Sequence, residues 1–270
     1  MHLDVRDIAA FYAAPLGQAA ARAMRRPLRA LWPDVRGLRV AGLGFAGPYL
    51  LPFRAEAASC LALMPAAQGC QRWPGRGRSS SALVEEAHLP LPDASIDRLL
   101  MVHVLETSET VRPLLREAWR VLSDDGRLLL VVPNRLSLWA QAERTPFGHG
   151  HPFTRGQIGR LLGEGLFRPT AFEHGLLMPP VALRAVIASS GALERAGLRL
   201  WPHFSGVHVV EAEKDLYAGV PARPARALRA PVLGIARPAQ PAPLDDAHGM
   251  IRERNALSPE RPGGAPASSD

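Results

Sequence analysis

The chain has 270 residues, is 47% hydrophobic and 21% charged, and has a formal net charge of +7. These proportions are typical of a globular protein with a core of useful size. No stretch reaches the roughly 18 uncharged apolar residues that a membrane span needs. Residues 1–12 also lack the apolar segment of a signal peptide. We therefore expect a cytoplasmic protein.

The positive charge is distributed along the chain. Nearly all basic residues are arginines, and Lys214 is the only lysine. Nucleic-acid-binding proteins usually concentrate their basic residues in one patch. We therefore do not expect nucleic acid as the main partner. One basic stretch is interpreted as a solvated helix face, with an acidic partner or substrate as the alternative; it comprises Arg22, Arg25, Arg26 and Arg29.

Apolar strand-like runs alternate with helix-like segments up to residue 217. This alternation predicts a parallel sheet with helices on both faces. In chain order we expect a helical region at 6–31 broken at Pro15 and Pro27, a strand at 38–43, a helix at 48–57, strands at 59–64 and 82–85, a strand at 97–103, a helix at 111–122, a strand at 127–133, a helix at 154–166, a strand at 169–175, a helix at 181–196 and a strand at 207–212.

Residues 218–270 differ in composition from the rest. Proline, alanine, arginine and glycine dominate there, and few large apolar side chains remain. Such a segment cannot bury enough surface to offset the entropy of ordering it. We therefore predict one folded domain over residues 1–217 and a disordered tail over 218–270.

The stretch 85–134 contains the strongest motif. It reads EEAHLPLPDASIDRLLMVHVLETSETVRPLLREAWRVLSDDGRLLLVVPN. It resembles the type 11 family of class I S-adenosylmethionine-dependent methyltransferases. The matching positions, in order, are Leu89-Pro90, Pro92-Asp93, Asp97, the segment 103–106 (His-Val-Leu-Glu), the segment 120–122 (Arg-Val-Leu), Gly126 and Pro133-Asn134.

This resemblance implies a Rossmann-like methyltransferase fold. We expect a mostly parallel, seven-stranded twisted sheet with helices on both faces and an antiparallel last strand. The resemblance also implies S-adenosylmethionine as cofactor, bound across the carboxyl ends of the first strands at the topological switch point. The residues expected to line that site are Gly42, Gly44, Phe45, Ala46, Met64, Glu85, Glu86 and His103.

The cofactor loop departs from the family pattern in two ways. The family loop reads Asp-x-Gly-x-Gly-x-Gly, whereas this chain has Gly42, Gly44, Ala46 and Pro48 at the Asp and Gly positions. The acid that normally grips the ribose hydroxyls is replaced by Met64 or Pro65, although Gln68 could partly substitute. Losing that charge-assisted bond costs about 1.5–3 kcal/mol.

The segment 42–47 also spells G-x-G-x-x-G, which is typical of nicotinamide dehydrogenases. That interpretation requires an acid or arginine at a strand end about 20 residues later. The stretch 61–68 contains neither, and the methyltransferase pattern follows downstream. We therefore favour the methyltransferase.

Three histidines are candidates for catalysis. His103, at the end of the fourth strand, could form a general-base pair with Glu106. His149 and His151 lie in a loop that commonly covers the acceptor site in this superfamily, so we expect contact with the acceptor or base catalysis. His149 and His151 have the i, i+2 spacing seen in some metal sites, but no third ligand stands at a defined spacing, and Cys60 and Cys70 form no zinc-ligand cluster. We therefore predict no metal site.

We therefore predict a methyltransferase that acts on a small-molecule acceptor. The alternative is a non-catalytic binding or scaffold protein of the same fold, and a third hypothesis is an RNA-directed protein. A pocket open between Gly44, Glu85 and His103 would favour the enzyme. A pocket filled by Phe45, Met64 or Tyr49 would favour the non-catalytic protein.

Overall fold

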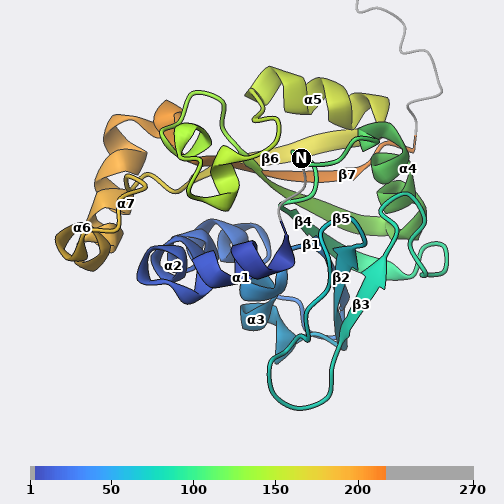
Figure 1. Cartoon of the computed structure of the whole chain (residues 1–270). Helices are drawn as coiled ribbons and strands as arrows, with labels where there is room; N and C mark the ends of the chain where they lie inside the picture. Colours follow the sequence, from blue (N-terminus) through green and yellow to red (C-terminus); the bar gives the residue numbers. More distant parts are fainter. Residues whose placement is uncertain (1–3, 217–270) are drawn as a thin grey trace, which may run out of the picture. The chain divides into compact units, whose positions relative to one another are not determined.

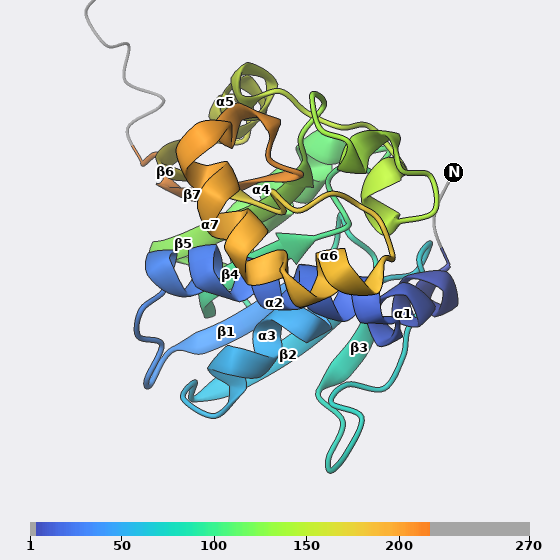
Figure 2. The same ribbon diagram turned by 90° about the vertical axis from the view of Figure 1, so that its left-hand side faces the viewer.

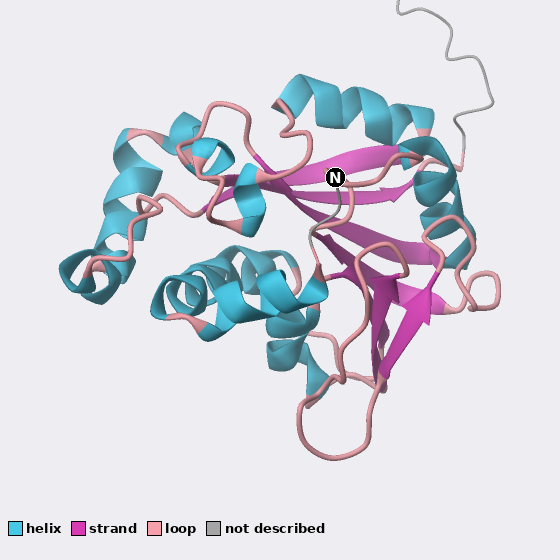
Figure 3. Cartoon of the chain, in the orientation of Figure 1, coloured by secondary structure: helices cyan, strands magenta, loops and turns pink. Residues whose placement is uncertain are grey.

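A computed structural model describes residues 4–216, which fall within one compact unit. The seven strands form a single sheet, coloured magenta in Figure 3, in the order β3-β2-β1-β4-β5-β7-β6. They are β1 (Arg39–Gly44), β2 (Ser59–Pro65), β3 (Ser81–Val84), β4 (Ile96–Val102), β5 (Leu122–Pro133), β6 (Phe167–Gly175) and β7 (Val207–Lys214). The described pairings are parallel except those of β7, which runs antiparallel to both β5 and β6. The predicted fold class is thus confirmed.

Helices cover both faces of the sheet (Figure 1). The helices are α1 (Val5–Ala13), α2 (Pro15–Leu31), α3 (Gly47–Arg54), α4 (Val111–Val121), α5 (Arg155–Glu164), α6 (Arg184–Ala188) and α7 (Ser190–Leu200), with short 3-10 turns η1 (Trp139–Gln141), η2 (Pro146–Gly148) and η3 (Pro202–Phe204). No described helix is both long and apolar enough to cross a membrane. Residues 218–270, where we predict a disordered tail, lie outside the described residues.

Two hydrophobic layers hold the helices against the sheet, because side chains alternate between its faces. In β4, Leu100 and Val102 pack with the residues of α1, α2 and α3. Their neighbours Leu99 and Met101 pack with the residues of α4 and α5. Strands buried on both faces have continuous apolar runs, which explains why β4 and β5 are so apolar in the sequence.

Two predicted helices are each divided. The region 6–31 forms α1 and α2, which separate at Ala14 because Pro15 begins a new helix. Pro27 does not break α2, although a break was predicted there; it is buried inside the helix. The region 181–196 forms α6 and α7, which separate at Ser189.

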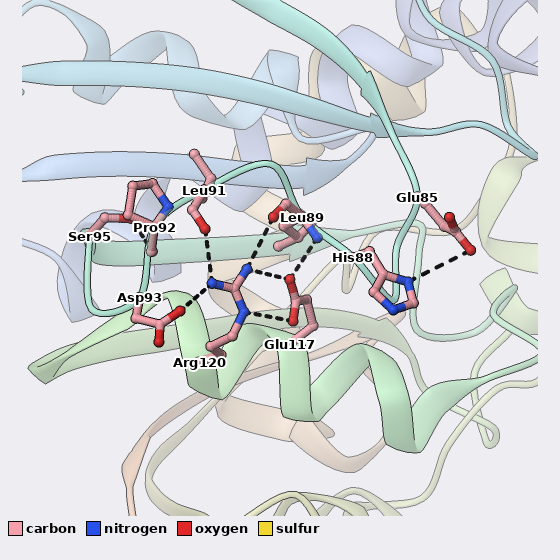
Figure 4. Close-up of polar contacts among 9 residues, drawn as sticks. All are labelled: Glu85, His88, Leu89, Leu91, Pro92, Asp93, Ser95, Glu117 and Arg120. Atoms are coloured by element: carbon pink, nitrogen blue, oxygen red, sulfur yellow. Dashed lines mark hydrogen bonds and ion pairs between the residues drawn. The ribbon is translucent and has the colours of Figure 1, made fainter.

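The Leu-Pro and Arg-Val-Leu motifs have a structural role around Arg120 (Figure 4). Its guanidinium donates to the carbonyl oxygens of Leu89 (3.1 Å) and Leu91 (2.9 Å). It also pairs with the carboxylates of Asp93 and Glu117, at 2.5 Å each. This network, the Arg120 corner, fastens the loop before β4 to α4.

Lys214 is the last residue of β7. Its side chain is only 3% exposed, and its Nζ lies 4.2 Å from the centre of the Trp119 ring and 3.7 Å from Asp124 Oδ1. Burial lowers the pKa of this ammonium group. The charge is thus held between an aromatic face and one exposed carboxylate.

Candidate cofactor site

The carboxyl ends of β1, β2 and β4 meet at one edge of the sheet, beside the point where the strand order reverses. Helix α1 lies against this edge. The backbone N–H of Val5 donates to the carbonyl oxygen of Gln68, which follows β2, over 2.8 Å. The hydroxyl of Tyr12 contacts His103, which follows β4. The predicted site is therefore assembled from the expected strand ends and from one additional helix.

Gly44 ends β1 in a conformation that requires glycine. Its φ is +83°, and an added Cβ would lie 2.2 Å from the carbonyl oxygen of Val102. At Gly42 a Cβ would lie 2.5 Å from that of Ala46 and 2.7 Å from Leu50 Cδ1. The atoms that approach these two glycines closely therefore belong to the protein, whereas a cofactor was expected there.

Five side chains fill the space above these strand ends. We call them the aromatic cluster; they are Tyr12, Phe45, Tyr49, His103 and Phe147. The Tyr12 and Phe45 rings stack with centres 5.4 Å apart, and the His103 and Phe147 rings are 4.7 Å apart. All five are at most 8% exposed.

A hydrogen-bonded chain runs through the aromatic cluster. His103 Nδ1 lies 3.1 Å from Glu106 Oε1, and His103 Nε2 lies 2.8 Å from the Tyr12 hydroxyl. The Tyr12 and Tyr49 hydroxyls are 2.6 Å apart. With the hydrogen on Nδ1 donated to the carboxylate, Nε2 accepts from Tyr12, which in turn accepts from Tyr49. The pairing predicted for His103 and Glu106 is present, but Tyr12 occupies the free nitrogen.

Burial keeps both tyrosines neutral. It is the main cause that raises the pKa of Tyr12 and of Tyr49 above the ordinary value for a phenol. In this conformation neither hydroxyl is an available base. His103 itself has a φ of +54°, an uncommon conformation for a residue other than glycine. Such conformations persist where the surroundings fix them, and they occur often at functional sites.

The end of β2 lacks the usual acid, as the sequence indicates. Met64 is fully buried, and its sulfur accepts from the N–H of Gln71 over 3.3 Å. Gln68 turns inward, and its Nε2 donates to the carbonyl oxygen of His103 over 2.9 Å. Its Oε1 has no hydrogen-bond partner, and neither has Glu106 Oε2. Two buried acceptors are thus unpartnered near His103, which is unusual in a native protein.

An open pocket of about 390 Å³ lies at the ends of β2 and β3. Glu85 and Glu86 line it, as do Ala66 and Ala67, which directly precede Gln68. Glu85 is exposed and lies 3.8 Å from His88, whereas Glu86 accepts a 2.7 Å bond from the Ser108 hydroxyl. The carboxylates that were expected near an adenine group therefore border free space.

The site offers S-adenosylmethionine space at one end only. The pocket beside Glu85 could take a flat polar group such as adenine. At the ends of β1 and β4, where the ribose and the methionine would lie, the space is occupied by the buried rings of the aromatic cluster. The described conformation therefore does not fit the whole cofactor.

The two loop histidines lie apart from this chain of hydrogen bonds. His149 Nε2 is 2.7 Å from the carbonyl oxygen of Glu143, within its own loop. His151 is exposed, and its backbone N–H donates to the carbonyl oxygen of Glu106 over 2.7 Å. The loop thus lies beside the site, but the residue that it contributes to the aromatic cluster is Phe147, which contacts His103. Among the described residues no group of three or more His, Cys, Asp or Glu could hold a metal ion.

Sequence reasoning named Phe45 and Tyr49 as side chains that could fill this space, but missed the part played by Tyr12 and Phe147. Both come from elements far from β1 in the sequence. One signal was available, since two aromatic residues, Phe11 and Tyr12, stand together in the first helix.

The comparisons with known proteins agree with the architecture. Residues 41–130 match the family model described as a methyltransferase domain, type 11. A methyltransferase structure from Mesorhizobium loti is 20% identical, covers 71% of this chain and 98% of its own, and has a TM-score of 0.51. One from Thermotoga maritima, a possible histamine N-methyltransferase, is 16% identical with coverages of 78% and 95% and a TM-score of 0.53.

A third similar structure, the [4+2]-cyclase SpnF, is 20% identical, covers 73% of this chain and 82% of its own, and has a TM-score of 0.50. No curated protein matches the sequence. The chain shares the Rossmann-like α/β fold of these methyltransferase structures. The resemblance to the type 11 methyltransferase family that the motif in 85–134 predicts is thus supported by the match over residues 41–130.

Proposed function

We propose that the protein is a methyltransferase that binds S-adenosylmethionine once Tyr12 has left the aromatic cluster. The observation that carries this proposal is the pair of buried, unpartnered acceptors, Gln68 Oε1 and Glu106 Oε2. Leaving such groups unpaired costs about 1–3 kcal/mol each. Ribose hydroxyls or the ammonium group of the cofactor would supply the missing donors.

Helix α1 is the element able to move. It has nine residues and lies outside the sheet, packed mainly on α2. It is tied to the site by the backbone bond from Val5 to Gln68, by the hydroxyl of Tyr12, and by the ring contacts of Tyr12 with Phe45 and of Phe11 with Phe147. Displacing α1 would therefore open the site without disturbing a strand.

Displacement of Tyr12 would also release Nε2 of His103. Glu106 would still hold the imidazole through Nδ1, so that Nε2 could accept a proton from a hydroxyl or amine of the acceptor. The cofactor, when bound, would supply the activated methyl group. We propose a small-molecule acceptor, with His149 and His151 beside its entrance, and a cytoplasmic location in keeping with the free thiols of Cys60 and Cys70.

The test is titration of S-adenosylhomocysteine into the protein by calorimetry. Tyr12→Ala should bind at least tenfold more tightly than the unchanged protein, because the ring no longer competes for the site. Phe204→Ala is the control, since that ring is 64% exposed and is not part of the aromatic cluster. No binding by either protein at millimolar ligand, with both folded, would contradict the proposal.

The second candidate is a non-catalytic protein of the same fold. The filled space at the ends of β1 and β4 favours it, since the cluster rings are almost fully buried. The similarity to SpnF is a reminder that one fold hosts different chemistries. Failure of Tyr12→Ala and of Phe45→Ala to bind S-adenosylhomocysteine would favour this candidate.

A further inference from the structure

Helices α2 and α7 lie side by side, although more than 150 residues separate them in the sequence (Figure 2). Two adjoining hollows, of about 570 and 290 Å³, run between them and share Arg26 and Arg195. We call this the basic groove. Arg22 and Arg26 line it from α2, and Arg195 and Arg199 line it from α7.

The charges of the basic groove are not neutralised within the described residues. None of its four arginines has an ion pair or a hydrogen bond to a described side chain, whereas Arg29 on the same helix pairs with Glu56. Among the described residues that line the groove, the sole acid is Glu194. Its carboxylate accepts from the N–H of Met178, and burial raises its pKa.

Two exposed aromatic rings follow α7 in the sequence, and the first stands two residues after Arg199. Trp201 follows the helix directly and is 46% exposed, and Phe204, in η3, is 64% exposed. Arginines that track a backbone, followed by rings on which bases stack, are the usual means of binding single-stranded nucleic acid. A groove walled by two helices also suits an extended polymer better than it suits a flat lipid surface.

We propose that the basic groove binds single-stranded RNA, with phosphates on the four arginines and a base on Trp201. Guanidinium groups bind phosphate through two parallel hydrogen bonds. The fold brings together basic residues that are dispersed in the sequence, and so creates the concentrated patch that a nucleic-acid partner requires. This inference goes beyond the proposed methyl transfer and does not depend on it.

The experiment measures binding of a fluorescein-labelled 20-mer of uridine to the full chain by anisotropy, as a function of salt. The double variant Arg26→Ala/Arg195→Ala removes one arginine from each wall. Losing two phosphate contacts should lower the slope of log K against log salt by about 1.4, which is roughly 25-fold in affinity at 0.1 M salt. Trp201→Ala should weaken binding by about fivefold or more with little change in that slope.

The matched control is Arg116→Ala/Arg160→Ala, which removes the same charge from two exposed arginines on α4 and α5. It should change affinity less than threefold. The proposal is overturned if the unchanged protein does not bind the RNA, or if the control loses as much affinity as the groove variant. It is also overturned if the groove variant still binds RNA but no longer binds vesicles of phosphatidylserine, since the groove would then serve a membrane.

Discussion

The Arg120 corner and the aromatic cluster belong to the same sheet, but they differ in how far they keep the sequence pattern of the methyltransferase family. At the corner, motif residues of the family satisfy one another, and one guanidinium contacts two carbonyl oxygens and two carboxylates. At the cluster, the positions that should meet a cofactor contact aromatic side chains of the protein. The family pattern is therefore retained where it holds the chain together and altered where it would hold a ligand.

A sequence motif can therefore indicate the architecture of a protein without indicating a functional site. Arg120 has the environment of a structural residue, since every group it bonds belongs to the protein. His103 and Glu106 have the environment of a site, because one acceptor remains unpartnered after all protein contacts are made. Substitutions in the two regions should therefore separate a loss of stability from a change in ligand binding.

Gly44→Ala should have the largest effect. A residue with a side chain is strained at φ +83°, and its Cβ would overlap the carbonyl oxygen of Val102. Strain and overlap together should lower the free energy of unfolding by about 4 kcal/mol, measured by urea denaturation. Gly159→Ala, in the middle of α5 with no atom within 4 Å, is the control and should be neutral or stabilising. Equal loss in both variants would show that β1 has no special demand for glycine.

Arg120→Ala should cost about 3 kcal/mol, because it leaves two carbonyl oxygens and two carboxylates without their donor. Arg116→Ala, one turn earlier on α4 and exposed, should change stability by no more than about 0.5 kcal/mol. Chemical denaturation of both variants gives the comparison. Binding of S-adenosylhomocysteine, corrected for folded fraction, should be unaffected, and a specific loss of binding would make the corner part of the site.

Tyr12→Phe should cost about 2 kcal/mol, because His103 Nε2 and the Tyr49 hydroxyl both lose a buried partner. Tyr49→Phe leaves the bond between Tyr12 and His103 intact and should cost only about 1 kcal/mol. The two variants can be compared by thermal unfolding. If they are equally stable, the hydrogen-bonded chain does not hold the aromatic cluster together.

His208 extends the test to β7, the strand beside β5. Burial, with smaller contributions from His174 and Arg155, lowers the pKa of His208 to about 4. The unfolded chain, with an ordinary histidine pKa near 6.5, then binds the proton more readily than the folded one. The stability that neutral His208 contributes is therefore fully present above about pH 7 and is lost as the pH falls toward 4. Between pH 7.5 and 5 it should reduce stability by about 1–2 kcal/mol, and His208→Gln should remove that part of the slope in urea denaturation.

Most of the fold could be predicted from the sequence, because strand and helix periods are local signals. The apolar runs of β4 and β5 and the amphipathic spacing of α4 give the elements and their order. The break predicted at Pro27 was wrong because tertiary packing holds that proline within α2. The extent of the predicted folded domain, residues 1–217, stays a prediction.

The candidate site could be predicted only in part. Gly44, His103 and Glu106 follow strands, so the sheet brings them to one edge, as expected. Tyr12 joins them across 91 residues of sequence, and no local pattern reports such a contact. The basic groove shows the same limit, because spacing along the chain says nothing of how α2 and α7 lie against each other.

Lys214 gives this protein a natural reporter. It is the chain's only lysine, so an amine-acylating reagent has just one side chain to modify besides the terminal amine. Because its side chain is only 3% exposed and its Nζ lies over the Trp119 ring, acylation should require the end of β7 to separate from α4. The rate of labelling, followed by mass spectrometry of the intact chain, would thus measure how often this contact opens, without an introduced probe.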